Sequence, residues 1–174
     1  IATGVAVFIN NGDGTLRSPT SYPVGQVTYS FALGSFNSDQ RPDIVVTDYY
    51  GGIKVLLNRG AGSFLPAVTY PLPFNPATLA AGDFDADGAV DLAVGADNLG
   101  TQHIDVLKNN GSGVFSLWAQ VWLPADRAKS IEVADLDRDG RVDIVYHVFR
   151  DAPGVFVILN KPTGFQSPVK YPTL

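Results

Sequence analysis

The sequence contains no cysteine and no methionine, and Glu132 is the only glutamate among its 17 acidic residues. Without cysteine the chain forms no disulfide and offers no thiolate to a metal, so its stability must come from packing or from another kind of crosslink. No apolar run approaches the roughly 18 to 20 residues that span a bilayer. Basic residues are also few, with 12 Lys and Arg among 174 residues and a formal net charge of -5. This charge excludes the basic footprint that nucleic-acid-binding proteins need.

What the sequence does contain is an internal repeat. Asn10, Asn58, Asn109 and Asn160 recur at steps of 48, 51 and 51 residues, each at the end of an apolar run such as "VAVFIN" or "IKVLLN". Each unit holds four short runs rich in Val, Ile, Leu, Phe and Tyr, which are separated by Gly, Asn, Asp or Pro. This pattern is typical of short strands joined by tight turns, and no segment has a sustained helical period. In the middle unit the expected strands are "ATLAAGDF", "VDLAVGA", "HIDVLKN" and "VFSLWAQVWL".

Repetition at this period is typical of β-propeller blades, which stack face to face because a single four-stranded sheet cannot bury both of its faces. The sequence therefore predicts an all-β fold with blades of four antiparallel strands, about three and a half blades in all. Closed propellers typically have four to eight blades, so we expect a longer parent chain or self-association to complete the ring. We expect residues 1–174 to form a single partial propeller, with a half blade at 4–24 and blades at 26–72, 76–124 and 128–173.

A tyrosine–proline pair also recurs near the end of the units. It occurs at Tyr22, Tyr70 and Tyr171, and Trp122 is expected to take the same place in the middle unit. Recurrence with the repeat favours a packing role for these residues.

Aspartates are concentrated at one point of the repeat. Residues 83–91 and 135–143 both match D-x-D-x-D-G-x-x-D, with the glycine at Gly88 and Gly140. Alternate carboxylates in a tight turn between the first and second strands point inward, and the glycine permits the positive φ that bends the loop. Such an all-oxygen cage suits calcium, which takes six to eight oxygen ligands. The predicted ligands, including two backbone carbonyls, are Asp83, Asp85, Asp87, Ala89 and Asp91 in one loop and Asp135, Asp137, Asp139, Arg141 and Asp143 in the other.

A third loop keeps only part of this pattern. Gln40 stands where the glycine is expected, so we expect this loop to have lost two charges and its permissive bend. We therefore expect two calcium ions per chain and treat this loop as a weaker, third site. An EF-hand would need a Glu at position 12 and flanking helices, which these loops lack; the other alternative, a solvated Asp-Gly turn, is disfavoured by the recurrence of the full pattern. The ligands of the weaker site would be Ser35, Asn37, Asp39, Arg41 and Asp43.

The segments "LAAGDFDADGAVDLAVG" and "VADLDRDGRVDIVYH", with turns such as "INNGDGTL" and "NRGAGSF", resemble the FG-GAP or VCBS repeat family. The best-known relatives in that family form the seven-bladed head of integrin α subunits. The resemblance covers nearly the whole chain and implies an integrin-like propeller, with calcium in the loops between first and second strands and partners bound on the opposite face. The repeat spacing is more similar to that of bacterial secreted members, which implies an extracellular or secreted protein.

Motifs for catalysis are missing, since His103 and His147 stand in no motif with a nucleophile and there is no G-x-S-x-G elbow. We therefore expect a non-catalytic, calcium-binding module for extracellular recognition or scaffolding, with an unidentified protein or glycan partner. One alternative is a lectin with glycan pockets between blades, because a fungal lectin class also uses the fold that the resemblance implies. Another alternative is the accessory part of a secreted enzyme. The candidate ligand-binding residues are Tyr49, Tyr50, His103 and Arg150, which lie outside the repeat pattern, and Trp118 and Trp122, which are expected in an outer strand.

Overall fold

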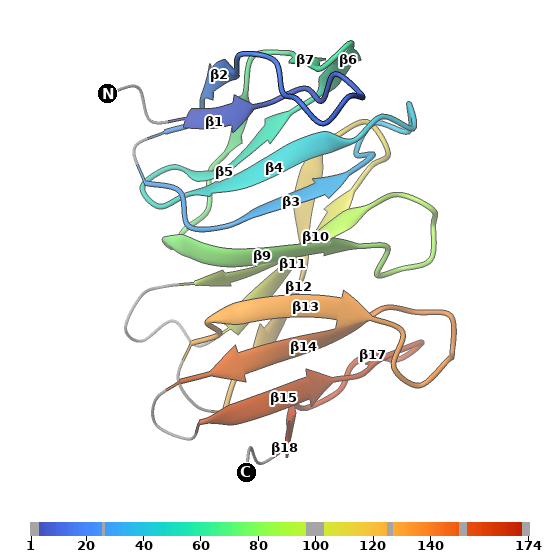
Figure 1. Cartoon of the computed structure of the whole chain (residues 1–174). Helices are drawn as coiled ribbons and strands as arrows, with labels where there is room; N and C mark the ends of the chain where they lie inside the picture. The colour runs from blue at the N-terminus through green and yellow to red at the C-terminus, as the bar shows by residue number, and fades with distance from the viewer. Residues whose placement is uncertain (1–3, 26, 97–102, 125–126, 150–152, 172–174) are drawn as a thin grey trace.

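The computed structural model describes residues 4–25, 27–96, 103–124, 127–149 and 153–171. Within these residues the chain forms strands and turns and has no helix, and therefore no helix long and apolar enough to cross a membrane. The strands form small antiparallel sheets that are stacked in chain order from the N-terminal to the C-terminal end (Figure 1). The predicted all-β fold is confirmed.

Three four-stranded sheets follow a two-stranded sheet, and we call them the first, second and third units and the half unit. In each complete unit the order of strands across the sheet is the order along the chain. The sheets fall within the residue ranges predicted for the blades, and the blade boundaries themselves stay a prediction. The half unit consists of β1 (Gly4–Val7) and β2 (Thr20–Pro23); the first unit of β3 (Phe31–Gly34), β4 (Asp43–Asp48), β5 (Gly52–Leu56) and β8 (Val68–Tyr70); the second unit of β9 (Pro76–Gly82), β10 (Asp91–Ala96), β11 (His103–Asn109) and β12 (Phe115–Trp122); and the third unit of β13 (Ser130–Ala134), β14 (Asp143–Val148), β15 (Gly154–Ile158) and β18 (Val169–Tyr171).

Short hairpins extend the turns between the third and fourth strands of the first and third units. They are formed by β6 (Asn58–Gly60) with β7 (Ser63–Phe64), and by β16 (Asn160–Lys161) with β17 (Gly164–Phe165). The recurring asparagine begins each hairpin. In the first unit the side-chain oxygen of this asparagine, Asn58 Oδ1, accepts a hydrogen bond from the backbone N–H of Gly60 at 2.8 Å, which is the way Asn commonly stabilises a turn.

The second strands are buried along their whole length. Every residue of β4 and of β10 is buried, because each of these strands lies inside its sheet and its sheet lies between two others. Both faces of such a strand meet apolar side chains, so "DIVVTD" and "DLAVGA" do not alternate between apolar and polar residues as half-exposed strands do.

Three separate apolar cores hold the stack together, one between each pair of neighbouring sheets. Alternate residues of β4 divide between two of them: Ile44 and Val46 face the half unit, whereas Val45 faces the second unit. The core between the second and third units includes Phe84, Ile104 and Tyr146, all fully buried or nearly so. Stability in this arrangement is a sum of contacts between neighbours, as in other repeat proteins.

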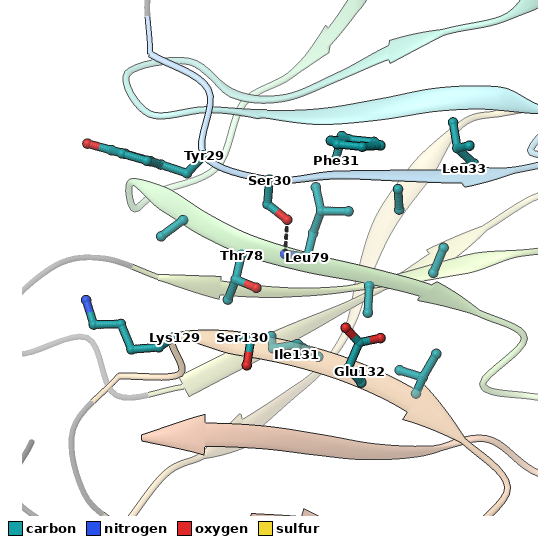
Figure 2. Close-up of a pocket in the computed structure, with 15 residues that line it drawn as sticks. Tyr29, Ser30, Phe31, Leu33, Thr78, Leu79, Lys129, Ser130, Ile131 and Glu132 are labelled. Carbon is teal, nitrogen blue, oxygen red and sulfur yellow. Dashed lines mark hydrogen bonds between the residues drawn. The ribbon is translucent and has the colours of Figure 1, made fainter. Parts of the chain in front are cut away.

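The first strands of the three complete units, β3, β9 and β13, lie side by side (Figures 1 and 2). Ser30 Oγ, just before β3, accepts a hydrogen bond from the backbone N–H of Leu79 in β9 at 3.3 Å. Small residues are needed here because the sheets approach closely: a Cβ on Gly82 would lie 3.0 Å from Val142 and 3.1 Å from Val133. The three strands line a hollow of about 480 Å³.

The fourth strand of the second unit contains an extra residue. The register of β11 and β12 shifts so that Val106 pairs with Ala119 and Leu107 pairs with Leu117, which leaves Trp118 as the bulged residue. Because a bulge moves every later residue by one position, Val121 pairs with Ile104 as Tyr70 pairs with Ile53 in the first unit. The prediction that Trp122 takes the tyrosine position is therefore wrong by one residue, since Trp122 pairs with His103.

Candidate metal centres

The loop between β9 and β10, residues 83–91, folds around its own aspartates. Asp83 Oδ2 accepts the backbone N–H of Gly88 at 2.8 Å, and Asp83 Oδ1 and Asp85 Oδ1 both accept that of Asp87 at 3.2 Å. The bend uses two residues with positive φ, Ala86 at 63° and Gly88 at 88°. The glycine therefore has the backbone conformation expected of it.

The loop between β13 and β14, residues 135–143, repeats this geometry in the next unit. Asp135 accepts the backbone N–H groups of Asp139 at 3.1 Å and Gly140 at 3.0 Å. The positive φ values recur as well, 63° at Arg138 and 87° at Gly140. Two sequences with different residues between the aspartates thus form the same loop.

Each of these loops gathers three carboxylates closely enough to share one ion. One carboxylate oxygen from each of Asp83, Asp85 and Asp91 lies within 4.8 Å of the others, and Asp135, Asp137 and Asp143 form the matching group. An all-oxygen donor set with one buried member fits a hard divalent cation such as calcium. The part played by the predicted backbone carbonyls of Ala89 and Arg141 stays a prediction.

The remaining aspartate of each loop, Asp87 or Asp139, contacts a lysine from the neighbouring part of its own unit. Lys108 Nζ on β11 contacts Asp85 and lies 3.0 Å from Asp87 Oδ2. Lys161 Nζ on β16 contacts Asp137 and lies 2.8 Å from Asp139 Oδ2. These contacts raise the pKa values of both ammonium groups well above their usual range. Each acidic loop therefore has a cation tethered to its own chain beside it.

Burial opposes the negative charge on Asp91. It raises the pKa of Asp91 from 3.8 to about 6, and the nearby charges of Asp85 and Asp87 add to the shift, while backbone N–H donors oppose it. The folded chain holds the proton on the Asp91 carboxyl more tightly than the unfolded chain does. The protonated carboxyl therefore adds to the free energy of unfolding below about pH 4, and this contribution is lost as the pH rises through about 6. At neutral pH the ionised loop therefore favours a compensating cation.

The loop between β3 and β4 keeps the same bend without the glycine. Gln40 has a φ of 63°, with Ser38 at 61°, so the prediction that this loop has lost its bend is wrong. The backbone N–H of Gln40 donates to Ser35 Oγ at 3.0 Å, which replaces the carboxylate contact of the other loops. Asp39 is paired with Arg41 at 3.2 Å. Among the described residues the acidic groups close enough to share an ion lie in the other two loops, so calcium at this loop stays the weaker prediction.

The last aspartate of each loop has a second role that the sequence analysis missed. Asp91 Oδ2 accepts the backbone N–H of Phe84 at 3.0 Å, and Oδ1 accepts that of Asn109 at 2.8 Å. Asp43 and Asp143 make the same pair of bonds in their own units. The signal available in the sequence was that this aspartate persists in the loop that has lost two of its four acidic residues.

The recurring asparagine joins one unit to the next. Asn109 Nδ2 donates to the carbonyl of Val90 at 3.0 Å in its own unit and to that of Phe36 at 2.8 Å in the first unit. Asn160 Nδ2 likewise donates to the carbonyl of Phe84 at 2.6 Å in the second unit. The side chains of Asn109 and Asn160 are buried, so these bonds fix the spacing between sheets where the candidate metal loops begin.

The predicted ligand-binding residues fall into separate groups. Tyr49 and Tyr50 pack together with ring centroids 4.9 Å apart, and Tyr50 is 73% exposed. His103 is only 9% exposed and lies 3.0 Å from Asp105 Oδ1 and 5.3 Å, between ring centroids, from the 66% exposed Trp122.

The other two candidates do not join these groups. Trp118 packs against Phe165 of the third unit at 5.7 Å between ring centroids, and Arg150 lies outside the described residues. The structure therefore brings His103 and Trp122 together and does not assemble the full predicted set into one site.

A comparison with protein families gives two overlapping matches. The sequence model of a family described as FG-GAP-like repeat matches residues 36–94 and again residues 83–146. Together the two matches span more than half of the chain and include both candidate metal loops. A search of curated proteins found no match.

Proposed function

Because the chain belongs to the FG-GAP-like repeat family, we propose that it is a calcium-stabilised, non-catalytic module for recognition or scaffolding outside the cell. Repeats of this family are usually extracellular, and they typically bind partners rather than catalyse reactions. The identity of the partner, whether protein or glycan, stays a prediction, as does the alternative that the chain is the accessory part of a secreted enzyme.

Two clusters of three aspartates support calcium most directly. In each cluster one carboxylate oxygen from each aspartate lies within 4.8 Å of the others, and the two clusters lie at the same point of two consecutive units. Three carboxylates held this close repel one another unless a cation lies among them. Calcium sites in extracellular modules have dissociation constants of about 10⁻⁴ to 10⁻³ M, which suits a loop that is partly exposed.

Calcium at these loops would act as the crosslink that cysteine would otherwise provide. Each loop joins the first and second strands of its unit, and its last aspartate already bonds the start of the next turn through Asn109 or Asn160. An ion bound to the same aspartate would tie the loop to this network. The free energy of binding would thereby add to the free energy of unfolding.

The number of calcium ions bound by the chelator-treated protein tests the proposal. Isothermal titration calorimetry should give two ions per chain, and Asp87→Ala or Asp139→Ala should each remove one. Asp13→Ala is the matched control, because Asp13 is an exposed aspartate in another turn that bonds only its neighbour Thr15 among the described residues. Absence of calcium-dependent heat, or a stoichiometry that neither loop variant changes, would overturn the proposal.

A further inference from the structure

Asp105, on the third strand of the second unit, is a charged residue at a position that faces the preceding unit. It is 1% exposed and lies four residues before the recurring asparagine, where the first and third units have Lys54 and Phe156. Lys54 Nζ forms an ion pair with Asp48 at 3.2 Å, and Phe156 stacks on Tyr146 with ring centroids 4.9 Å apart. The second unit therefore has a carboxylate where its neighbours have an ion-paired lysine or a packed ring.

Two side chains of the same unit contact this carboxylate. Gln120 Nε2 donates to Asp105 Oδ1 at 2.9 Å, and His103 Nε2 lies 3.0 Å from the same oxygen. His103 Nδ1 is buried without a hydrogen-bond partner among the described residues. A doubly protonated ring would leave its Nδ1–H group unpaired in a buried position, which is costly. We therefore assign the neutral ring, with its proton on Nε2.

The negative charge on Asp105 has no cation beside it. Among the described residues, no lysine or arginine forms an ion pair with it, and both contacts fall on Oδ1, so that Oδ2 is left without a donor. Burial raises the pKa of Asp105, while the hydrogen bond from Gln120 and the nearby His103 oppose the shift. A cation beside Oδ2 would favour the charged carboxylate.

Asp105 lines a pocket of about 230 Å³ between the first and second units, both of which are complete four-stranded sheets. The Tyr70 hydroxyl donates to the carbonyl of Gly113 at 2.7 Å and is thus already used within the protein. Tyr70 also meets Phe115 edge to face, with ring centroids 5.6 Å apart. The walls around the carboxylate are mainly apolar and include Tyr70, Leu72, Leu107, Phe115 and Leu117.

The corresponding pocket between the second and third units has no such carboxylate. It has a volume of about 310 Å³ and is lined by residues 119–122 and 165–168. No residue of β15 lines it, because Phe156, at 3% exposed, occupies the position that corresponds to Asp105. Of these two pockets, only the one at Asp105 has a buried charge in its wall.

An alkylammonium group suits the pocket at Asp105 better than a sugar or a guanidinium. A sugar carries hydroxyl groups on every side and needs several polar partners, whereas the pocket offers one free carboxylate oxygen among mainly apolar walls. A guanidinium pairs best with both oxygens of a carboxylate, and Oδ1 is already used by Gln120 and His103. A lysine ammonium needs only one such oxygen, and its four-carbon stem packs on apolar and aromatic walls.

We propose that this pocket binds the side chain of a lysine on a partner protein, with the ammonium group beside Asp105 Oδ2. The proposal rests on the recognition role proposed above and adds the chemistry of the partner. None of the residues that line the pocket belongs to the candidate metal loops, so lysine binding does not involve calcium directly.

Nα-acetyl-lysine amide is a suitable probe, because it presents the side chain without a charged α-amino group. Added to the whole isotope-labelled protein in calcium, it should shift the amide NMR signals of Asp105, Leu107 and Leu117, with saturation in the millimolar range. Nα-acetyl-norleucine amide has the stem without the ammonium, and it should bind about tenfold more weakly. Nα-acetyl-arginine amide should also bind more weakly.

On the protein side, Asp105→Asn keeps the shape of the side chain and should weaken binding of the lysine probe about tenfold. Asp13→Asn is the matched control, because it changes an exposed aspartate in another turn, and it should leave binding unchanged. Leu117→Ala shortens a wall residue that is 56% exposed and should weaken binding about threefold. Leu65→Ala, at an exposed leucine outside the pocket, should have no effect. If Asp105→Asn does not fold, the two leucine variants decide.

The proposal is overturned by the absence of saturable shifts up to about 100 mM probe, by equal binding of the lysine and norleucine probes, or by shifts confined to other parts of the chain. N-acetylglucosamine is the sugar probe, and stronger binding of this sugar at the same residues would also overturn the proposal and make a glycan the occupant. Calcium stoichiometry is measured separately by calorimetry, so failure of lysine binding and failure of the calcium proposal give different results.

Discussion

At the scale of single residues, the last aspartate of each loop has a structural role that does not depend on a metal. Asp43, Asp91 and Asp143 are each 0% exposed, and each accepts two backbone N–H groups from different parts of its unit. The sequence identified these residues as ligands but not as acceptors for the backbone. A bond from an N–H some 15 to 18 residues away is set by strand register, which the spacing of aspartates alone does not reveal.

Asp43→Ala tests this structural role in the loop where calcium is least expected. The substitution leaves two N–H donors without an acceptor in a buried position, so it should lower the free energy of unfolding by about 2–5 kcal/mol. Urea denaturation in EDTA measures the effect. Asp39→Ala is the control in the same loop, since it removes a carboxylate paired with the exposed Arg41 and should cost less than about 1 kcal/mol. Equal losses for the two variants would contradict the assignment.

The bend at Gln40 is a second feature that the identity of single residues did not predict. Its replacement of glycine suggested a loop without the bend, yet the backbone keeps a φ of 63° there. The hydrogen bonds of Asp43 and Ser35 hold both ends of the loop, and they determine the backbone path in spite of the less favourable residue. Tertiary bonds can impose a left-handed conformation that local preference disfavours.

At the scale of elements, the strands and turns were largely predictable and the contacts between them were not. The middle unit has its four strands at nearly the expected residues, because Gly, Asn and Asp mark each turn. The bulge at Trp118 was missed, since one inserted residue leaves the apolar pattern almost intact while it reverses which side chains face the next sheet. The reach of Lys108 and Lys161 into the acidic loops was also missed, because it depends on how the strands are placed across the sheet.

Those two lysines should compete with calcium for the loops. A tethered ammonium offsets part of the carboxylate repulsion, so removing it should leave the loop with a stronger preference for a divalent ion. In the Asp139→Ala background, which leaves one site, Lys108→Ala should lower the calcium dissociation constant about threefold. Lys161→Ala should do the same in the Asp87→Ala background.

Calorimetric titration of these variants gives the dissociation constants. Lys170→Ala is the matched control, because Lys170 is exposed on β18 and distant in sequence from both loops. Unchanged or weaker calcium binding after removal of Lys108 would show that this lysine supports the site rather than competing with calcium.

At the scale of the whole molecule, stability comes from three cores between four stacked sheets rather than from one common core. The repeat in the sequence predicted this stacking because each unit is too thin to bury its own faces. The smallest core lies against the half unit, where four buried apolar residues hold the sheets together. This end of the stack should open first.

In the proposed function, calcium stabilises the stack through the two intact loops. The most direct test is thermal unfolding, followed by circular dichroism, in calcium at about 100 times the dissociation constant and again in excess EDTA. Calcium should raise the melting temperature by roughly 5–10 °C for each occupied site, and the Asp87→Ala, Asp139→Ala double variant should lose this increase. Identical melting curves in calcium and in EDTA for the unmodified protein would contradict the account.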